Sequence, residues 1–237
     1  MQPNETLHLS VDCVLFGYDD DGLKVLLINQ KADTYAHEKG QPMSQLPGDL
    51  ILIEEGLDEA AERVLYELTQ VNGVYLKKFH AYGDPNRVKD HKDRAWLRYV
   101  RTMPDQRVVT VGYLGLVSLH DYDPQPASFA GGVSWVDIND VGPLAFDHNS
   151  ILNGAIAALQ TQLESHHISF ELLPKKFTLS QLQALYETVL DKKFDKRNFR
   201  KNVKKMSHVV PLDEKQQGVM HKPAQLFSFN PEQIAHD

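Results

Sequence analysis

Apolar positions divide the first two-thirds of the chain into alternating strands and helices. Two apolar, β-branched segments at 7–18 and 23–30 flank the turn-forming sequence DDDG and predict a hairpin. Apolar residues at helical spacing over 57–71 predict an amphipathic helix with a polar outer arc. The same reasoning predicts further strands at 74–82, 108–119 and 133–136, and a second helix that Asp147 or Asn149 caps and that ends near Leu163.

The pattern changes after residues 164–169, a polar stretch that we interpret as a linker. Thr178 is a good N-cap for a helix carrying Leu182, Leu185 and Val189. Asp195 caps the next predicted helix, whose inner side is formed by Phe199, Val203 and Met206, with Phe194 as a hydrophobic staple. Two short strands follow at 209–212 and 224–229. Helix, helix and two strands are the outline of a winged helix-turn-helix.

Positive charge is concentrated in this C-terminal third. Residues 175–205 hold ten Lys or Arg and three acids, a net +7, whereas the whole chain carries −7. Such asymmetry indicates an anionic partner, and a solvated charged helix is the alternative. Because Arg and Asn contact base edges and Lys neutralises phosphates, we expect double-stranded DNA as the partner. The predicted DNA-binding residues are Lys192, Lys193, Lys196, Arg197, Asn198, Arg200, Lys201, Lys204 and, in the wing, Lys222.

Bulk properties exclude several classes of protein. With 237 residues, 42% hydrophobic and 24% charged, the chain resembles a soluble globular protein of one large or two small domains. No segment has the length of a membrane span, and no secretory signal is visible. The single cysteine, Cys13, excludes a disulfide framework, and the eleven histidines form no metal pattern. We therefore expect a cytoplasmic protein without metal or cofactor.

Gly48, Glu55, Arg63 and Glu67 resemble a Nudix box. In a competent box the helix carries several glutamates that bind Mg²⁺ for cleavage of a diphosphate. Here Val64 and Leu68 stand at two of the three glutamate positions, and Gln70 replaces the closing glycine. We expect Val64 and Leu68 to pack in the core, Arg63 to support the loop through Glu55, and hydrolysis to be lost. The alternative is a Nudix-type hydrolase of a nucleoside diphosphate derivative with a basic C-terminal extension, and residual activity is left open.

A degenerate Nudix domain joined to a winged helix resembles the Nudix-related transcriptional regulators, of the ADP-ribose and arabinose types. The sequences GDPNR at 83–87, RVVTVGYLGL at 107–116 and DKRNFRK at 195–201 are similar to signatures of that family. The resemblance implies an α+β protein: a Nudix-like α/β/α sandwich at 1–165 that senses a ligand, followed by a winged helix-turn-helix at 170–237. It also implies a small-molecule effector and a homodimer, since helix-turn-helix operators are commonly two-fold.

The effector pocket departs from the family pattern. Asp49 stands where a glycine would allow close approach to a ligand, and its carboxylate would repel a diphosphate. The loop 88–106 is also longer than usual, so the identity of the effector does not carry over from the family. The repulsion by Asp49 favours a neutral sugar-like effector or an altered pocket. We expect a sugar or a nucleotide-sugar-like effector, and a pocket that binds nothing is left open. The predicted effector-binding residues are Gln30, Asp49, Tyr82, Arg87, Arg107 and Tyr113. Each has an ordinary alternative: the arginines can pair with Asp84 or Asp105, and the tyrosines can be core residues.

Overall fold

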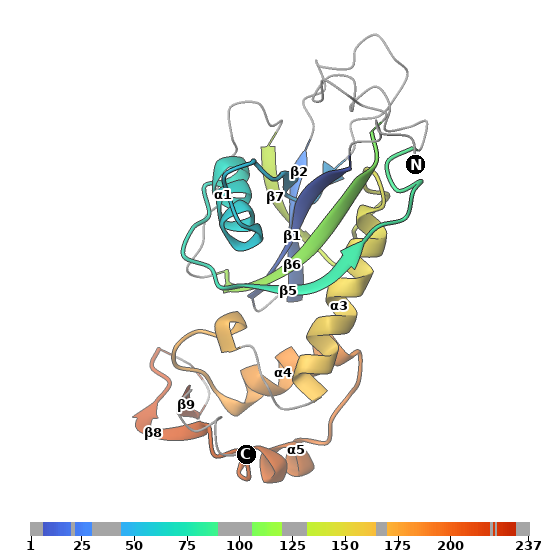
Figure 1. The fold of residues 1–237 in the computed structure, drawn as a ribbon. Helices are drawn as coiled ribbons and strands as arrows, with labels where there is room; N and C mark the ends of the chain where they lie inside the picture. Colours follow the sequence, from blue (N-terminus) through green and yellow to red (C-terminus); the bar gives the residue numbers. More distant parts are fainter. Residues whose placement is uncertain are drawn as a thin grey trace.

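The computed structural model describes residues 7–19, 22–29, 44–89, 106–119, 132–164, 170–218, 220 and 222–230. A mixed sheet between two helices forms the larger part, and a smaller unit of helices and a hairpin lies at one end of it (Figure 1). This is the α+β organisation expected from the sequence. Among the described residues, no helix is long and apolar enough to cross a membrane.

The sheet is built on a long central strand. β1 (His8–Asp19) and β2 (Gly22–Asn29) form the predicted antiparallel hairpin. On its other side β1 runs parallel to β6 (Val108–Ser118) over the whole length of β6, and β5 (Leu76–Tyr82) is antiparallel to β6. Three shorter strands complete the described sheet: β3 (Ser44–Gln45) and β7 (Gly132–Asp137) on β2, and β4 (Gly48–Leu50) on β1.

One helix covers each face of this sheet (Figure 1). α1 (Leu57–Thr69) buries the apolar stripe that its sequence predicts, and it packs on the face formed by Val11, Cys13 and Leu15 of β1. α3 (His148–Glu164) packs on the opposite face, where Val14 and Phe16 lie, because successive side chains of a strand point to opposite sides. The α/β/α sandwich is therefore confirmed.

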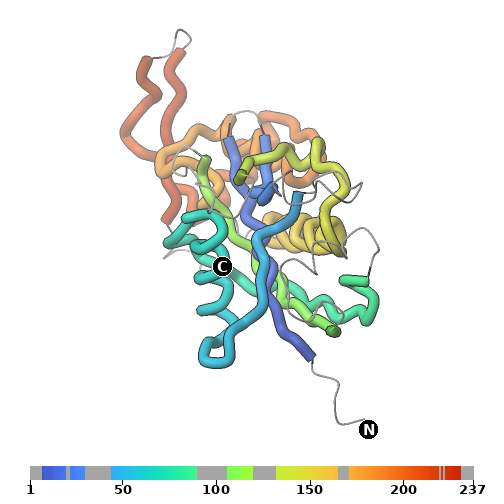
Figure 2. The backbone as a smooth tube through the Cα atoms, turned by 90° about the horizontal axis from the view of Figure 1, so that it is seen from above, coloured from blue at the N-terminus to red at the C-terminus, as the bar shows by residue number. Residues whose placement is uncertain are grey.

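The C-terminal unit has the predicted order of elements. The 3-10 turn η3 (Phe170–Leu172) is followed by α4 (Leu179–Leu190), α5 (Lys196–Val203), β8 (Val209–Lys215) and β9 (Gln225–Phe229). Thr178 accepts the Gln181 N–H at the start of α4, and Asp195 accepts the Asn198 N–H at the start of α5, so both predicted caps are confirmed. The β8–β9 hairpin extends away from the helices as a wing (Figure 2).

The two units share one hydrophobic core. Leu159 and Leu163 of α3 belong to the same buried cluster as Leu182 and Leu185 of α4 and Phe199 of α5. The Gln160 side chain also donates to the Val189 carbonyl, 2.9 Å away, near the C-terminus of α4. Residues 165–169 of the predicted linker lie outside the described residues. The winged helix is thus packed against the end of α3 (Figure 1).

Candidate functional site: a Nudix-box remnant and a cationic helix

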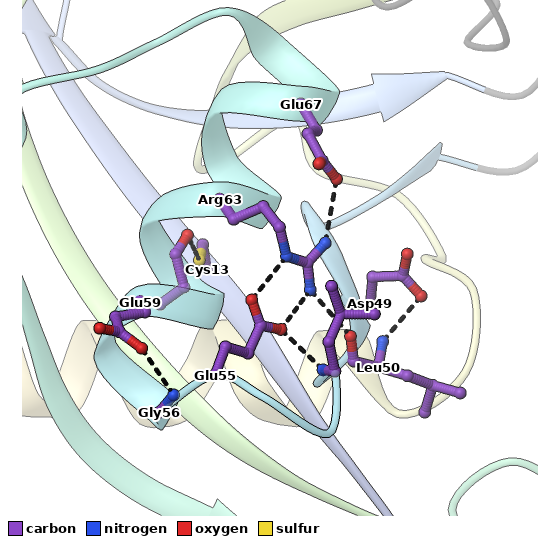
Figure 3. A network of polar contacts seen from close by, with 10 residues as sticks. Cys13, Asp49, Leu50, Glu55, Gly56, Glu59, Arg63 and Glu67 are labelled. Atoms are coloured by element: carbon purple, nitrogen blue, oxygen red, sulfur yellow. Dashed lines mark hydrogen bonds and ion pairs between the residues drawn. The ribbon is translucent and has the colours of Figure 1, made fainter.

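Arg63 is the centre of the polar network in front of α1 (Figure 3). Its guanidinium makes a two-pronged contact with the Glu55 carboxylate, at 2.8 and 2.6 Å, and donates to the Leu50 carbonyl at 3.1 Å. Glu55 in turn accepts the Leu52 N–H. Hydrogen bonding to Arg63 is the main reason that the pKa of Glu55 falls to about 2. Arg63 therefore supports the β4–α1 loop, as the sequence predicts.

The remaining acid of the box is used in the same network. Glu67 accepts a hydrogen bond from Arg63 at 2.9 Å across one helical turn (Figure 3). Val64 and Leu68, at the positions of the missing glutamates, are 1% and 8% exposed and pack in the core under α1. The described residues contain no group of three or more His, Cys, Asp or Glu that could hold a metal ion.

The glycine before Asp49 is required by a close approach. A Cβ on Gly48 would overlap the carboxylate of Asp12, so β4 can lie this near β1 only without a side chain there. Asp49 itself is exposed, and its carboxylate accepts the N–H of Leu50. A negative side chain consequently faces solvent beside the Nudix-box remnant.

A buried ion-pair cluster lies on the other face of the sheet. Arg87, only 3% exposed at its side chain, makes two contacts of 2.9 and 2.8 Å with Asp147 and one of 3.3 Å with Asp12. His148 completes the cluster: Nδ1 accepts the Leu46 N–H, and Nε2 lies 3.4 Å from Asp12 Oδ1. These contacts join β1, the 83–89 turn and the beginning of α3.

The acidity of Asp12 follows from these partners. Burial alone would raise the pKa of this carboxyl. His148 and Arg87 together outweigh the effect of burial and lower the pKa to about 2. The alternative ion pair between Arg87 and Asp84 is not formed, since it is the Arg87 backbone N–H that contacts Asp84, through its carbonyl. Arg87 therefore holds the GDPNR turn against the fold and is not free to bind a ligand.

The structure does not bring the predicted effector-binding residues together. Tyr113 is fully buried on the α1 side and donates to Asp58, which makes it a core residue. Tyr82 lies on the α3 side, with its hydroxyl against the helix backbone at Gly154. Arg107 and Asp49 are exposed, and Arg107 donates to the Gly83 carbonyl. Gln30 lies outside the described residues. Asp12, Asp147 and His148 were missed by sequence reasoning.

The cationic residues of α5 all face solvent. Phe199 and Val203 are the buried residues of this eight-residue helix. Lys196, Arg197, Asn198, Arg200, Lys201 and Lys204 are exposed, and their side chains make no ion pair with any described residue. One face of α5 thus anchors it, and the other presents four positive charges, with a fifth from Lys204 at the C-cap.

The flanking lysines have partners or lie in the wing. Lys192 pairs with Glu164 at the end of α3, at 3.1 Å, and Lys193 pairs with Glu187 of α4, at 3.2 Å. The Lys192–Glu164 pair is exposed on both sides and contributes little to stability, so it can be exchanged for an external anion. In the other pair Lys193 is exposed, whereas the Glu187 side chain is largely shielded. Lys222 is exposed in the connection between β8 and β9, which places it in the wing as expected.

Comparison with known proteins agrees with this arrangement. Residues 169–229 match the family model of the NrtR DNA-binding winged helix domain. The chain is 28% identical over 225 residues, 93% of its length and 81% of the relative, to the ADPR responsive transcriptional repressor NtrR of Acinetobacter baylyi. It is 30% identical to the Nudix domain of Shewanella oneidensis NrtR, crystallised with ADP ribose, over 67% of this chain and 94% of that one, with a TM-score of 0.51.

The chain belongs to the Nudix-related transcriptional regulators. The full-length S. oneidensis NrtR, crystallised with a 27mer DNA, has 26% identity and a TM-score of 0.69 and covers 96% of this chain and 95% of that one. These relatives confirm the architecture inferred from the sequence, a Nudix-like domain followed by a winged helix.

Arg87→Ala should destabilise the protein strongly, because it leaves Asp12 buried without its cation. We expect a loss of about 3–5 kcal/mol in the free energy of unfolding, measured by urea denaturation at pH 7. Because the pKa of Asp12 is lowered in the folded state, its contribution is present above pH 4 and disappears as the pH falls from about 4 towards 2. The difference between wild type and variant should therefore shrink at low pH, and equal stability at pH 7 would contradict the assignment.

Proposed function

We propose that this protein is a ligand-responsive regulator that binds operator DNA through α5 and the wing. The observation that carries the proposal is the exposed set of cations on α5, free of internal ion pairs among the described residues, on a helix whose apolar side is anchored in the core. Released counterions would drive binding of such a face to DNA. A relative that aligns with this chain over 95% of its own length has been crystallised with DNA. That complex supports the same role for this protein.

ADP-ribose is the effector that the relatives favour. A curated relative carries the description "ADPR responsive", and a similar Nudix domain has been crystallised with ADP ribose. The sequence led us to expect a sugar or a nucleotide-sugar-like effector. These two relatives favour a nucleoside diphosphate sugar over a neutral sugar. Among the predicted contacts, Arg107 is the exposed cation that can meet a phosphate, whereas Arg87 is buried and Asp49 is repulsive.

Loss of hydrolase activity is the second part of the proposal. Mg²⁺ requires octahedral ligation by oxygens, and Val64 and Leu68 supply none. Glu67 is already engaged by Arg63. The Nudix-like domain would then bind its ligand without cleaving it. We also propose a homodimer, since a two-fold protein matches the two half-sites that helix-turn-helix proteins commonly read.

Arg197→Ala and Arg200→Ala should each weaken DNA binding by about 1–3 kcal/mol, through lost contacts to bases or phosphates. Fluorescence anisotropy should be used with a duplex that the wild-type protein selects from a random library, over a series of salt concentrations. Lys77→Ala is the matched control, because Lys77 is an exposed cation on β5. If both arginine variants bind like the control, α5 is not the DNA-binding element.

ADP-ribose should raise the melting temperature and change the affinity for the selected duplex. At a ligand concentration one hundred times its Kd, binding to the folded state adds about 2.7 kcal/mol of stability. Arabinose and AMP serve as comparison ligands in the same thermal-shift assay. A shift with arabinose alone would reject the diphosphate and favour the sugar.

Incubation of ADP-ribose with the protein and Mg²⁺ should give no AMP above the protein-free background. Enzymes of ordinary efficiency turn over at about 1–1,000 per second, so even a weak hydrolase is detectable by chromatography of the products. Turnover at such rates that persists through purification to constant specific activity would contradict the loss of catalysis.

A further inference from the structure

The orientation of α5 depends on a very short connection. α4 ends at Leu190, Asp191 adopts a left-handed conformation with φ of 48°, and α5 begins after its cap Asp195. Only a few residues therefore set the angle between the two helices of the helix-turn-helix. Whatever fixes the backbone of this connection also fixes the direction in which the α5 cations point.

Two side chains of α4 bind both backbone polar groups of Phe194, the residue before that cap. The Gln183 amide donates to the Phe194 carbonyl at 2.9 Å, and the Glu187 carboxylate accepts the Phe194 N–H at 2.9 Å. Gln183 also donates to the same Glu187 oxygen, at 2.9 Å. Because the two residues are one helical turn apart, they form a single clamp on α4.

The clamp is largely shielded from solvent. Gln183 is 8% exposed as a residue and the Glu187 side chain 16%. The Phe194 ring adds an apolar contact, with its centroid 6.5 Å from that of Tyr186 and 5.7 Å from that of Phe199. Hydrogen bonds to Gln183 and to the Phe194 backbone hold the pKa of Glu187 at about 2, so the carboxylate is ionised at neutral pH.

We propose that Gln183 and Glu187 are positioning residues for DNA binding, which orient α5 by fixing Phe194 and make no contact with DNA themselves. The proposal rests on the proposed role of α5. The charge of Glu187 is unusual in this segment, because it lies among cations that would bind a polyanion. By Coulomb's law alone, removing this charge strengthens binding to DNA, so any weakening reports the lost backbone contact.

Loss of the charge and loss of the backbone contact change DNA affinity in opposite directions, so two variants of Glu187 can separate them. Glu187→Gln removes the charge but keeps an oxygen that can accept from Gln183 and Phe194, whereas Glu187→Ala removes charge and acceptor together. We expect Glu187→Gln to bind the selected duplex at least as tightly as wild type. Glu187→Ala should bind about ten-fold more weakly, the size expected for a lost hydrogen bond to a charged group.

Gln183→Met provides an independent variant, since it keeps the shape of the side chain and removes the donor to the Phe194 carbonyl. It should also weaken DNA binding, with ADP-ribose binding and far-ultraviolet circular dichroism unchanged. Faster amide hydrogen exchange at Phe194 and Asn198 in both loss variants would report the loosened turn. Glu62→Ala is the control, because Glu62 is an exposed acid on α1 far along the chain from α5.

Three results would overturn the inference. Tighter binding by both Glu187 variants would make Glu187 a purely electrostatic residue. Unchanged binding by Glu187→Ala and Gln183→Met would show that the turn needs no clamp. Equal loss in Glu187→Ala and Glu187→Gln would show that the charge, not the acceptor geometry, matters. Arg197→Ala is measured in parallel: if it too binds normally, the role of α5 has failed, whereas a loss in Arg197→Ala alone rejects only the clamp.

Discussion

Burial of two side chains, Phe199 and Val203, determines which way an eight-residue helix faces. α5 is too short to be stable alone, so its position comes from the apolar contacts that it makes with α4 and with the aromatic pair Tyr186 and Phe194. Once that side is fixed, every other residue of the helix must lie outward. The positive side chains proposed to bind DNA are exposed because so little of the helix is apolar.

The same packing joins the DNA-binding part to the sensing part. α3 covers one face of the sheet with its first turns and contacts α4 with its last, and Leu159, Leu163 and Leu182 belong to one core. Asp147, at the beginning of α3, is held by Arg87 and through it by Asp12. A ligand that moved this end of the helix would therefore act on a rigid element whose other end contacts the winged helix. Such a path is a continuous physical connection between the sheet and the winged helix.

Much of the fold could be predicted because the sequence is locally consistent. Apolar, β-branched segments on either side of the DDDG turn placed β1 and β2, and helical spacing of apolar residues placed α1, α4 and α5. Thr178 and Asp195 marked two helix starts by their capping chemistry. The loss of the box glutamates was also visible, since Val64 and Leu68 fall on the apolar stripe of α1.

The effector residues were harder to predict, because their neighbours are distant in sequence. Arg87 was predicted to bind the effector, with an ion pair to Asp84 or Asp105 as the alternative, but it binds Asp147 and Asp12, 60 and 75 residues away. Tyr113 and Tyr82 were grouped as one pocket, although adjacent strands place them on opposite faces of the sheet. The two tyrosines lie on different strands whose register shifts between Lys78 and His80, so alternation of side chains along one strand could not have separated them. No local pattern could have revealed the pairing of Arg87, which exists only once β1, the GDPNR turn and α3 meet.

Contact between α5 and duplex DNA is most directly measured by cross-linking from single introduced cysteines. The only native cysteine, Cys13, is fully buried, and burial raises its pKa well above the usual range, so it should not compete for a thiol-reactive photo-cross-linker. A cross-linker on Asn198→Cys should capture the selected duplex, whereas the same group on Glu62→Cys of α1 should not. Capture from α1 but not from α5 would contradict the account.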